Sequence, residues 1–340
     1  MPGQFFRSGM VNDGALMSVQ GLKTYFHLRD GILKAVDNVS FEVQKGKVLG
    51  LVGESGCGKS ITARSILRMV KKPGQSTGSV LFHDNGDAID LIGLDPSGSE
   101  IRRIRGDKIS MIFQEPMNSL SPVHSIGNQV MEGVMLHLGL SRNDARLKAI
   151  ELLTNVGIAN PDTRIDSYPH QLSGGMRQRA MIAIAISCNP SLLLADEPTT
   201  ALDVSVQAQI LKLLKDLQAQ NNMSIIFITH DLAVVAQMAD RVLVMYLGQE
   251  MEEADVGDIF YEPLHPYTEK LLDSMPDLSK ARKKDRLEII EGSVPEPINL
   301  PQRCVFYDRC HRAIEGTCDR QIPDLFTPKP GHRVRCFLYA

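Results

Sequence analysis

Apolar residues along the first 270 positions alternate between short runs and longer stretches with one apolar face. The runs lie at 48–52, 108–113, 192–195 and 224–229, and such runs are typical of strands buried on both faces of a mainly parallel sheet. Residues 206–219 place Ile210, Leu213, Leu214 and Leu217 at helical spacing, which predicts an amphipathic helix, and 144–156 has the same pattern. This alternation predicts α/β architecture.

The pattern changes near residue 277. A strongly charged segment, KARKKDR, spans 280–286, and five prolines follow between Pro295 and Pro328. Such composition is typical of a linker and a loop-rich segment. We therefore expect a main domain over 1–276, a linker over 277–290 and a small module over 291–340.

Composition excludes several classes of protein. Hydrophobic residues make up 43% of the 340, and 37 basic against 40 acidic side chains leave a net charge of -3. These values argue against a disordered chain and against a nucleic-acid-binding protein. The longest uncharged stretch, 180–195, is shorter than the roughly 20 residues of a membrane helix, and the N-terminus has no apolar signal sequence. We expect a cytosolic chain.

The clearest motif is GESGCGKS at 53–60, between an apolar run and a helical pattern at 61–70. It matches the phosphate-binding loop, or P-loop, in which glycines and a helix N-terminus turn backbone N–H groups toward a phosphate. Lys59 is expected to reach the β- and γ-phosphates and Ser60 to ligate Mg²⁺. Cys57 is either a tolerated small residue or a redox-sensitive thiol. The predicted ATP contacts are Gly53, Glu54, Ser55, Gly56, Cys57, Gly58, Lys59, Ser60 and Ile61.

Two carboxylates, Asp196 and Glu197, follow the apolar run at 192–195. Ligands of doubly wound sheets bind at the carboxyl ends of the strands, so Asp196 is expected to hold Mg²⁺ and Glu197 to orient an attacking water. His230 ends the neighbouring run and is placed to contact a γ-phosphate. The alternatives are an exposed strand end and a structural histidine.

A second anion site is predicted at LSGGMRQR, residues 172–179. Ser173 is a candidate N-cap, and the paired glycines Gly174 and Gly175 expose backbone N–H groups. The alternative is a capped helix with basic residues in its first turn.

The order of these motifs resembles the ATP-binding subunits of ABC transporters over residues 14–265. The resemblance rests on the P-loop, Gln114, LSGGMRQR, LLLADE, the Ala201-Leu202-Asp203 segment and His230. It implies a RecA-like P-loop ATPase core with a helical subdomain inserted at about 116–187. It also implies a head-to-tail dimer, in which the signature residues Ser173, Gly174, Gly175 and Gln178 contact ATP held by the partner's P-loop.

Further roles follow from this resemblance. Gln114 would act in catalysis, contact Mg²⁺ and sense the membrane subunits, and Asp203 would lie at the dimer interface. Phe26 would stack on adenine, with Tyr25 as the alternative. The helical subdomain would touch the membrane partner. ATP would close the dimer and hydrolysis would release it.

Four of the six cysteines lie close to the C-terminus: Cys304, Cys310, Cys318 and Cys336. A module of about 50 residues buries little core and needs a cross-link, such as disulfides or a bound metal, to be stable. In a cytosolic chain a metal is more plausible than disulfides. The residues alone leave zinc and an iron–sulfur cluster both open.

Residues 261–276 and 292–310 resemble the C-terminal region of oligopeptide/dipeptide importer ATPases. The resemblance implies a [4Fe-4S] cluster on the four cysteines, with Zn²⁺ as the alternative, although Arg303 stands where the family more often has glycine. It implies an ATPase coupled to import of oligopeptides or dipeptides, at the cytoplasmic face of the inner or plasma membrane. Oligosaccharide or nickel import, and a soluble ABC ATPase outside transport, are the alternatives.

The same resemblance implies partners: two transmembrane permease subunits, an extracytoplasmic substrate-binding protein and a second ATPase chain, with no nucleic acid. Such importers usually pair two different ATPase chains, so a heterodimer is expected. A homodimer stays open because both half-sites are intact in this sequence.

Overall fold

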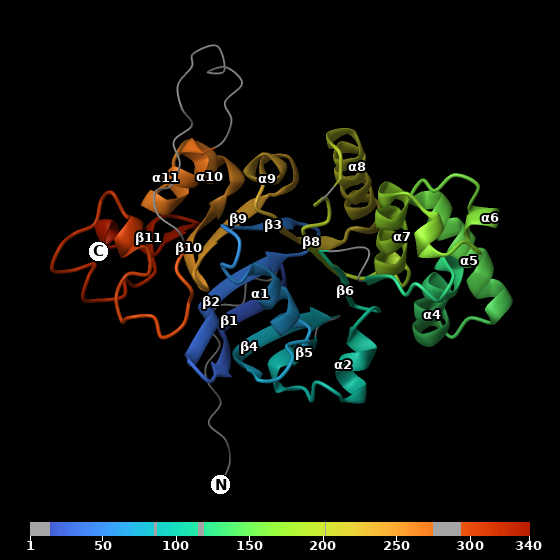
Figure 1. The fold of residues 1–340 in the computed structure, drawn as a ribbon, viewed down its shortest axis with the longest axis horizontal. Helices are drawn as coiled ribbons and strands as arrows, with labels where there is room; N and C mark the ends of the chain where they lie inside the picture. Colours follow the sequence, from blue (N-terminus) through green and yellow to red (C-terminus); the bar gives the residue numbers. More distant parts are fainter. Residues whose placement is uncertain (1–13, 85–86, 115–118, 201, 275–293) are drawn as a thin grey trace, which may run out of the picture.

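The computed structural model describes residues 14–84, 87–114, 119–200, 202–274 and 294–340. Its main sheet has eight strands in the order β11-β12-β10-β9-β3-β8-β7-β6, and a second sheet has four in the order β2-β1-β4-β5 (Figure 1). The second sheet is antiparallel and consists of β1 (Ala15–Leu28), β2 (Gly31–Gln44), β4 (Gly74–Asp84) and β5 (Asp87–Asp90).

The centre of the main sheet is parallel. It consists of β3 (Val48–Val52), β6 (Ile109–Ile112), β7 (Leu192–Asp196), β8 (Ser224–Ile228) and β9 (Arg241–Tyr246). Every residue of β3, β7 and β8 is buried. The prediction of doubly buried parallel strands is therefore confirmed.

Helices flank this sheet, and two of them test the predicted periodicity. α8 (Val204–Asn221) contains the predicted segment 206–219 and buries Ile210, Leu214 and Leu217, while α5 (Arg142–Asn155) covers most of 144–156. The helix expected at 61–70 is α1 (Lys59–Ile66), which is shorter because Arg68 has a left-handed φ of 56°. The helices α2 (Ser99–Ile104) and α9 (Leu232–Met238) also lie beside the sheets.

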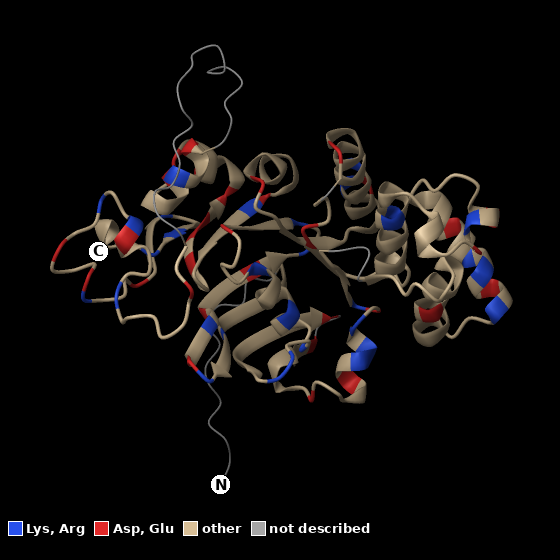
Figure 2. Cartoon of the chain, viewed as in Figure 1, with Lys and Arg blue, Asp and Glu red and all other residues tan. Residues whose placement is uncertain are grey.

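A helical lobe lies between β6 and β7 in the chain and forms the right-hand end of the molecule in Figure 1. It contains α4 (Ile126–Leu138), α5, α6 (Pro161–Arg164) and α7 (Gly174–Ile186). Ser125, Ser141 and Ser173 each cap the helix that follows by accepting a backbone N–H. Basic and acidic residues alternate along the helices of the lobe (Figure 2).

The C-terminal segment extends the main sheet. β10 (Gln249–Asp255) pairs with β9, β12 (His332–Val334) pairs with β10, and β11 (Phe326–Lys329) pairs with β12, all antiparallel. Between β10 and β11 in the chain lie α10 (Val256–Tyr261) and α11 (Pro266–Asp273). The segment is rich in loops, and its strands continue the main sheet, which the sequence pattern did not predict. The expected linker at 277–290 lies outside the described residues.

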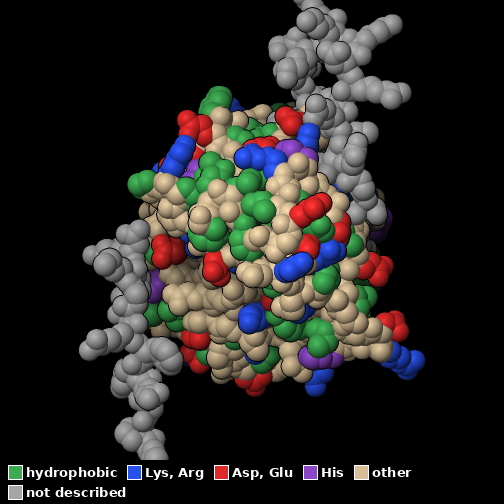
Figure 3. All heavy atoms as spheres, turned by 90° about the vertical axis from the view of Figure 1, so that its left-hand side faces the viewer, with side chains coloured by type: hydrophobic (Ala, Val, Ile, Leu, Met, Phe, Trp, Pro, Cys, Tyr) green, Lys and Arg blue, Asp and Glu red, His purple; other side chains and the backbone are tan. Residues whose placement is uncertain are grey.

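The surface over this end of the molecule mixes hydrophobic and charged side chains (Figure 3). Within the part of the chain that the structure describes, none of the helices combines the length and the apolar character needed to cross a membrane.

Candidate functional site

The P-loop follows β3 directly and depends on its glycines. Gly53, Gly56 and Gly58 have φ values of 147°, 81° and 102°, in the region that favours glycine. A Cβ on Gly53 would lie 2.2 Å from the Met245 carbonyl oxygen, and one on Gly58 would lie 2.1 Å from that of Ala35. The loop is thus seated against two strands where no side chain fits.

Lys59 starts α1 and lies within the loop. Its Nζ donates to the carbonyl oxygens of Gly53 at 2.8 Å and Glu54 at 3.0 Å, and the residue is only 5% exposed. Cys57 is also buried, and burial raises the pKa of its thiol. A buried thiol with a raised pKa is a poor nucleophile, so the structure favours the interpretation of Cys57 as a packing residue.

Ser60 and Asp196 meet at the end of β7. The Ser60 hydroxyl donates to Asp196 Oδ1 at 2.8 Å. Asp196 is fully buried, its pKa is raised by that burial, and its Oδ2 has no hydrogen-bond partner among the described residues. Hydroxyl and carboxylate oxygens are ligands that Mg²⁺ prefers, so this pair fits that ion.

Glu197 is held by three side chains. Gln114 Nε2 donates to Oε2 at 3.1 Å, Thr200 Oγ1 donates to Oε2 at 2.9 Å, and His230 Nδ1 lies 3.2 Å from Oε1. Burial raises the pKa of Glu197, but the Thr200 and His230 hydrogen bonds outweigh it, and the pKa lies below its usual value. The carboxyl is therefore ionised at neutral pH. Thr200 was missed at the sequence level, although its place three residues after Glu197 was a local signal.

Part of this arrangement lines one cavity of about 470 Å³. The start of the P-loop contributes one wall, and Gln114, Glu197 and His230 contribute the others. Residues from four separate segments thus converge at the carboxyl ends of the strands, and their handling of phosphate stays a prediction.

The two adenine-stacking candidates differ in their surroundings. The Tyr25 hydroxyl is hydrogen-bonded to Asp37, and Lys34 Nζ lies 5.5 Å from the centroid of its ring. Phe26 instead lines a cavity of about 690 Å³ beside Ile61 and Gln114. Of the two rings, Phe26 is the one that faces a cavity, and its stacking on adenine stays a prediction.

The predicted signature residues lie at the start of α7. Ser173 Oγ accepts the Met176 N–H at 3.3 Å, and the Cα of Gly174 faces open space. Gln178 is only 2% exposed, so its side chain lies inside this chain and not at a surface that a partner could reach. Its expected contact with a partner's ATP therefore has no support in this arrangement.

Asp203 has a local role that the sequence analysis did not predict. Its Oδ1 accepts the N–H groups of Ser205 at 3.1 Å and Val206 at 3.0 Å, and it thereby caps α8. A position at the dimer interface stays a prediction.

The four late cysteines lie near one another without forming a single-ion site. Burial, together with the nearby thiols of Cys318, Cys310 and Cys336, raises the pKa of Cys304 to about 12. Cys336 is affected in the same way, with a pKa of about 11. In the described ranges, however, no three His, Cys, Asp or Glu side chains are arranged to hold a metal ion. The cluster, and the zinc alternative, remain predictions.

Comparison with known families identifies two matching models. "ABC transporter" matches residues 36–200, and "Oligopeptide/dipeptide transporter, C-terminal region" matches residues 251–318.

Individual proteins and a solved structure are similar to this chain in the same way as the two family models. The chain is 51% identical to the oligopeptide transport ATP-binding protein AppD of Bacillus subtilis, over 95% of this chain and 97% of that protein. It is 47% identical to the dipeptide transport ATP-binding protein DppD of Haemophilus influenzae, over 95% of each. A dimeric ATP-binding cassette bound to ADP and Pi shares 28% identity and a TM-score of 0.62 over 71% of this chain and 98% of that one. The expected P-loop ATPase fold is therefore confirmed, and the chain belongs to the ATP-binding proteins of the ABC oligopeptide/dipeptide transporter family.

Proposed function

We propose that this chain is the ATP-hydrolysing, energy-coupling subunit of an ABC importer of oligopeptides or dipeptides. The observation that carries the proposal is the convergence of the P-loop, Gln114, Glu197 and His230 on one cavity. Names of the relatives support the cargo class, since they include both oligopeptide and dipeptide transport proteins.

The residues divide the chemistry among them. Lys59 and the P-loop N–H groups bind the triphosphate. Ser60 and Asp196 would hold Mg²⁺, which would neutralise charge on the phosphates. Glu197 orients and polarises the attacking water; its lowered pKa suits this role better than that of a strong base. His230 and Gln114 fix the Glu197 carboxylate and face the γ-phosphate end of the cavity.

ATP binding is coupled to motion through dimer closure. Ser173, the exposed Gly174 and the partly buried Gly175 contact ATP held by a second ATPase chain, and Phe26 stacks on the adenine. Because the γ-phosphate is contacted from both chains, its hydrolysis removes the contacts that favour the closed state. A heterodimer is the expected assembly.

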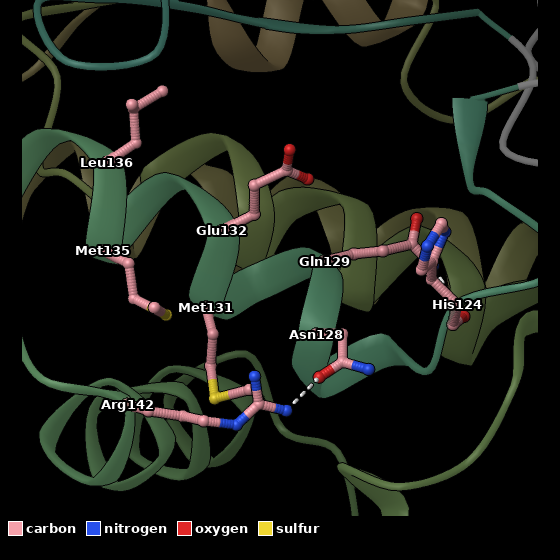
Figure 4. A pocket seen from close by; sticks show the side chains of 8 residues that line it. All are labelled: His124, Asn128, Gln129, Met131, Glu132, Met135, Leu136 and Arg142. Atoms are coloured by element: carbon pink, nitrogen blue, oxygen red, sulfur yellow. Dashed lines mark hydrogen bonds between the residues drawn. The ribbon is translucent and has the colours of Figure 1, made fainter.

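The permease docks on the helical lobe. A cavity of about 560 Å³ lies along α4, and Figure 4 shows the side chains that line it, with Arg142 of α5 closing one end by a 3.4 Å hydrogen bond to Asn128. Met131, Met135 and Leu136 give it an apolar wall, and methionine adapts readily to a partner surface. The occupant is a cytoplasmic segment of a permease subunit, which places this chain peripherally on the membrane.

We also propose that the four cysteines hold a [4Fe-4S] cluster, which would staple the C-terminal segment. Its support is that the neighbouring thiols raise one another's pKa, as close cysteines do; a cluster would bind them as thiolates. Anaerobically purified protein should contain about four irons per chain, and Cys304→Ser should lower that content. Stoichiometric zinc without iron would contradict this assignment.

Copurification tests the function most broadly. The tagged chain should bring down two permease subunits and a second ATPase, and the associated binding protein should bind labelled peptides. Binding of an oligosaccharide or of nickel would replace the cargo, and copurification with ribosomes or DNA would overturn the transport role altogether.

A further inference from the structure

The C-terminal segment reaches the P-loop through Arg309. The Nη1 and Nη2 atoms of Arg309 donate to Glu54 Oε2 at 2.7 Å and Oε1 at 3.0 Å. This is the bidentate arrangement in which a guanidinium binds a carboxylate most strongly. The Arg309 side chain is 5% exposed and that of Glu54 is 24% exposed, so the pair is only weakly screened by solvent.

Glu54 is the second residue of the P-loop and is fixed at three points. Its N–H donates to the Tyr267 hydroxyl at 3.0 Å, its carbonyl accepts from Lys59 Nζ at 3.0 Å, and its carboxylate is bound by Arg309. It also lines the cavity proposed to receive the γ-phosphate end of ATP. Without its counterion, this carboxylate would repel a triphosphate.

Arg309 is itself held in place. It ends a short 3-10 turn, η3 (Tyr307–Arg309), whose N–H groups bond to the carbonyls of Cys304 and Phe306. Its guanidinium lies over the ring of Tyr246, 5.7 Å from the centroid. Phe306 packs against Tyr246 and Tyr267 with ring centroids 5.3 and 5.2 Å apart. The segment that carries Cys304 and Cys310 is thus packed onto the base of the P-loop.

We propose that Arg309 is a positioning residue that sets nucleotide affinity by orienting and neutralising Glu54. The segment 304–310 is therefore a control element for the ATP site, and a change in its packing is transmitted to the P-loop through this ion pair. The inference rests on the proposed binding of the triphosphate by residues 53–60, and does not depend on the cargo or on the metal.

A double-mutant cycle tests the pair in the full chain. Kd for MgATP is measured for Arg309→Met, Glu54→Gln and the double variant. Arg309→Met should raise Kd about tenfold, about 1.4 kcal/mol, and Arg309→Lys should recover part of the loss. The double variant should have a Kd for MgATP no higher than that of the single variant with the higher Kd, because both substitutions remove the same interaction.

Two control variants distinguish failure of this inference from failure of the P-loop assignment on which it rests. Arg303→Met removes another arginine of the C-terminal segment. The carboxylate that Arg303 binds, at 2.7 Å, is that of Asp308 and not that of a P-loop residue, so this substitution should leave Kd unchanged. Lys59→Ala should abolish MgATP binding; retained binding would refute the P-loop assignment itself.

Steady-state kinetics of ATP hydrolysis give a second readout. In the assembled transporter, Arg309→Met should change KM for ATP more than kcat, as expected for a residue that acts on binding. Wild-type affinity in Arg309→Met, or additive effects in the double variant while Lys59→Ala fails to bind, would overturn the inference.

Discussion

At the scale of the residue, Glu197 shows how a strained position is held. Its φ of 46° lies in the left-handed region, which costs a non-glycine residue on the order of 1 kcal/mol. Its backbone N–H donates to the Ile228 carbonyl at 2.9 Å, and Gln114, Thr200 and His230 hold the carboxylate. Strain of this kind is found where a side chain must be aimed, and here it aims the carboxylate into the cavity.

Asp203 offers a prediction at the same scale. Asp203→Ala should lower the free energy of unfolding by about 1 kcal/mol, because α8 loses the acceptor for its first N–H groups. Asp203→Asn keeps an acceptor and should be close to wild type. Chemical denaturation of the isolated chain measures both. Equal destabilisation by the two substitutions would show that the hydrogen-bond acceptor is not the source of the effect.

Residues of the site differ in how far the sequence could predict them. Lys59, Ser60, Asp196 and Glu197 stand in short motifs whose spacing encodes their chemistry, so local sequence suffices. Arg309 lies 255 positions from Glu54, and only folding brings the two together. Long-range pairs of this kind leave no periodic or local signal in a single sequence.

At the scale of the element, β10 shows why the sequence pattern did not predict that the main sheet continues into the C-terminal segment. Glu250, Glu252 and Glu253 are all buried, whereas such a sequence is usually exposed. Each finds a partner from the last nine residues: Arg335 binds Glu250 at 3.0 Å, His332 binds Glu252 at 2.7 Å, and Arg333 binds Glu253. Buried charges require such partners, so β12 is selected as the neighbouring strand.

The start of α11 gives a pH prediction. His265 caps the helix by accepting the Tyr267 N–H at 3.0 Å, and complete burial lowers its pKa to about 4. The unfolded chain, with a histidine pKa of about 6.5, binds the proton first. This contribution to stability is therefore present above pH 6.5 and is lost as the pH falls towards 4, by at most about 1.4 kcal/mol per pH unit.

His265→Asn tests this dependence because asparagine keeps a capping acceptor and does not titrate. Denaturation curves at pH 7 and pH 5 should show a smaller loss of stability in the variant than in the wild type. An identical loss in the two proteins would exclude His265 as a source of the pH dependence.

At the scale of the whole molecule, the P-loop is contacted from both ends of the chain. β2 and β9 approach its glycines, and the C-terminal segment binds Glu54. The helical lobe lies at the opposite end of the main sheet from the C-terminal segment (Figure 1). Strands of the C-terminal segment thus share one sheet with the core, and the expected division into core, inserted helices and C-terminal module stays a prediction.

Permease docking gives the prediction at this scale. Leu136 is 74% exposed and lines the cavity along α4, so Leu136→Glu should weaken assembly with the permease by placing a charge against an apolar partner. Leu147→Glu is the matched control, since Leu147 is 67% exposed on α5 outside that lining. Size-exclusion chromatography of the complex measures assembly. Equal assembly of both variants would argue against docking at this cavity.

The most direct test of the central claim is Glu197→Gln in the purified transporter with its partners. The substitution preserves the shape of the side chain and removes the charge that polarises water, so MgATP binding should persist while hydrolysis at this site falls on the order of 10²–10³-fold. Binding and hydrolysis are measured on the same preparation. Wild-type hydrolysis by the variant would contradict the assignment of Glu197 and, with it, the proposed mechanism.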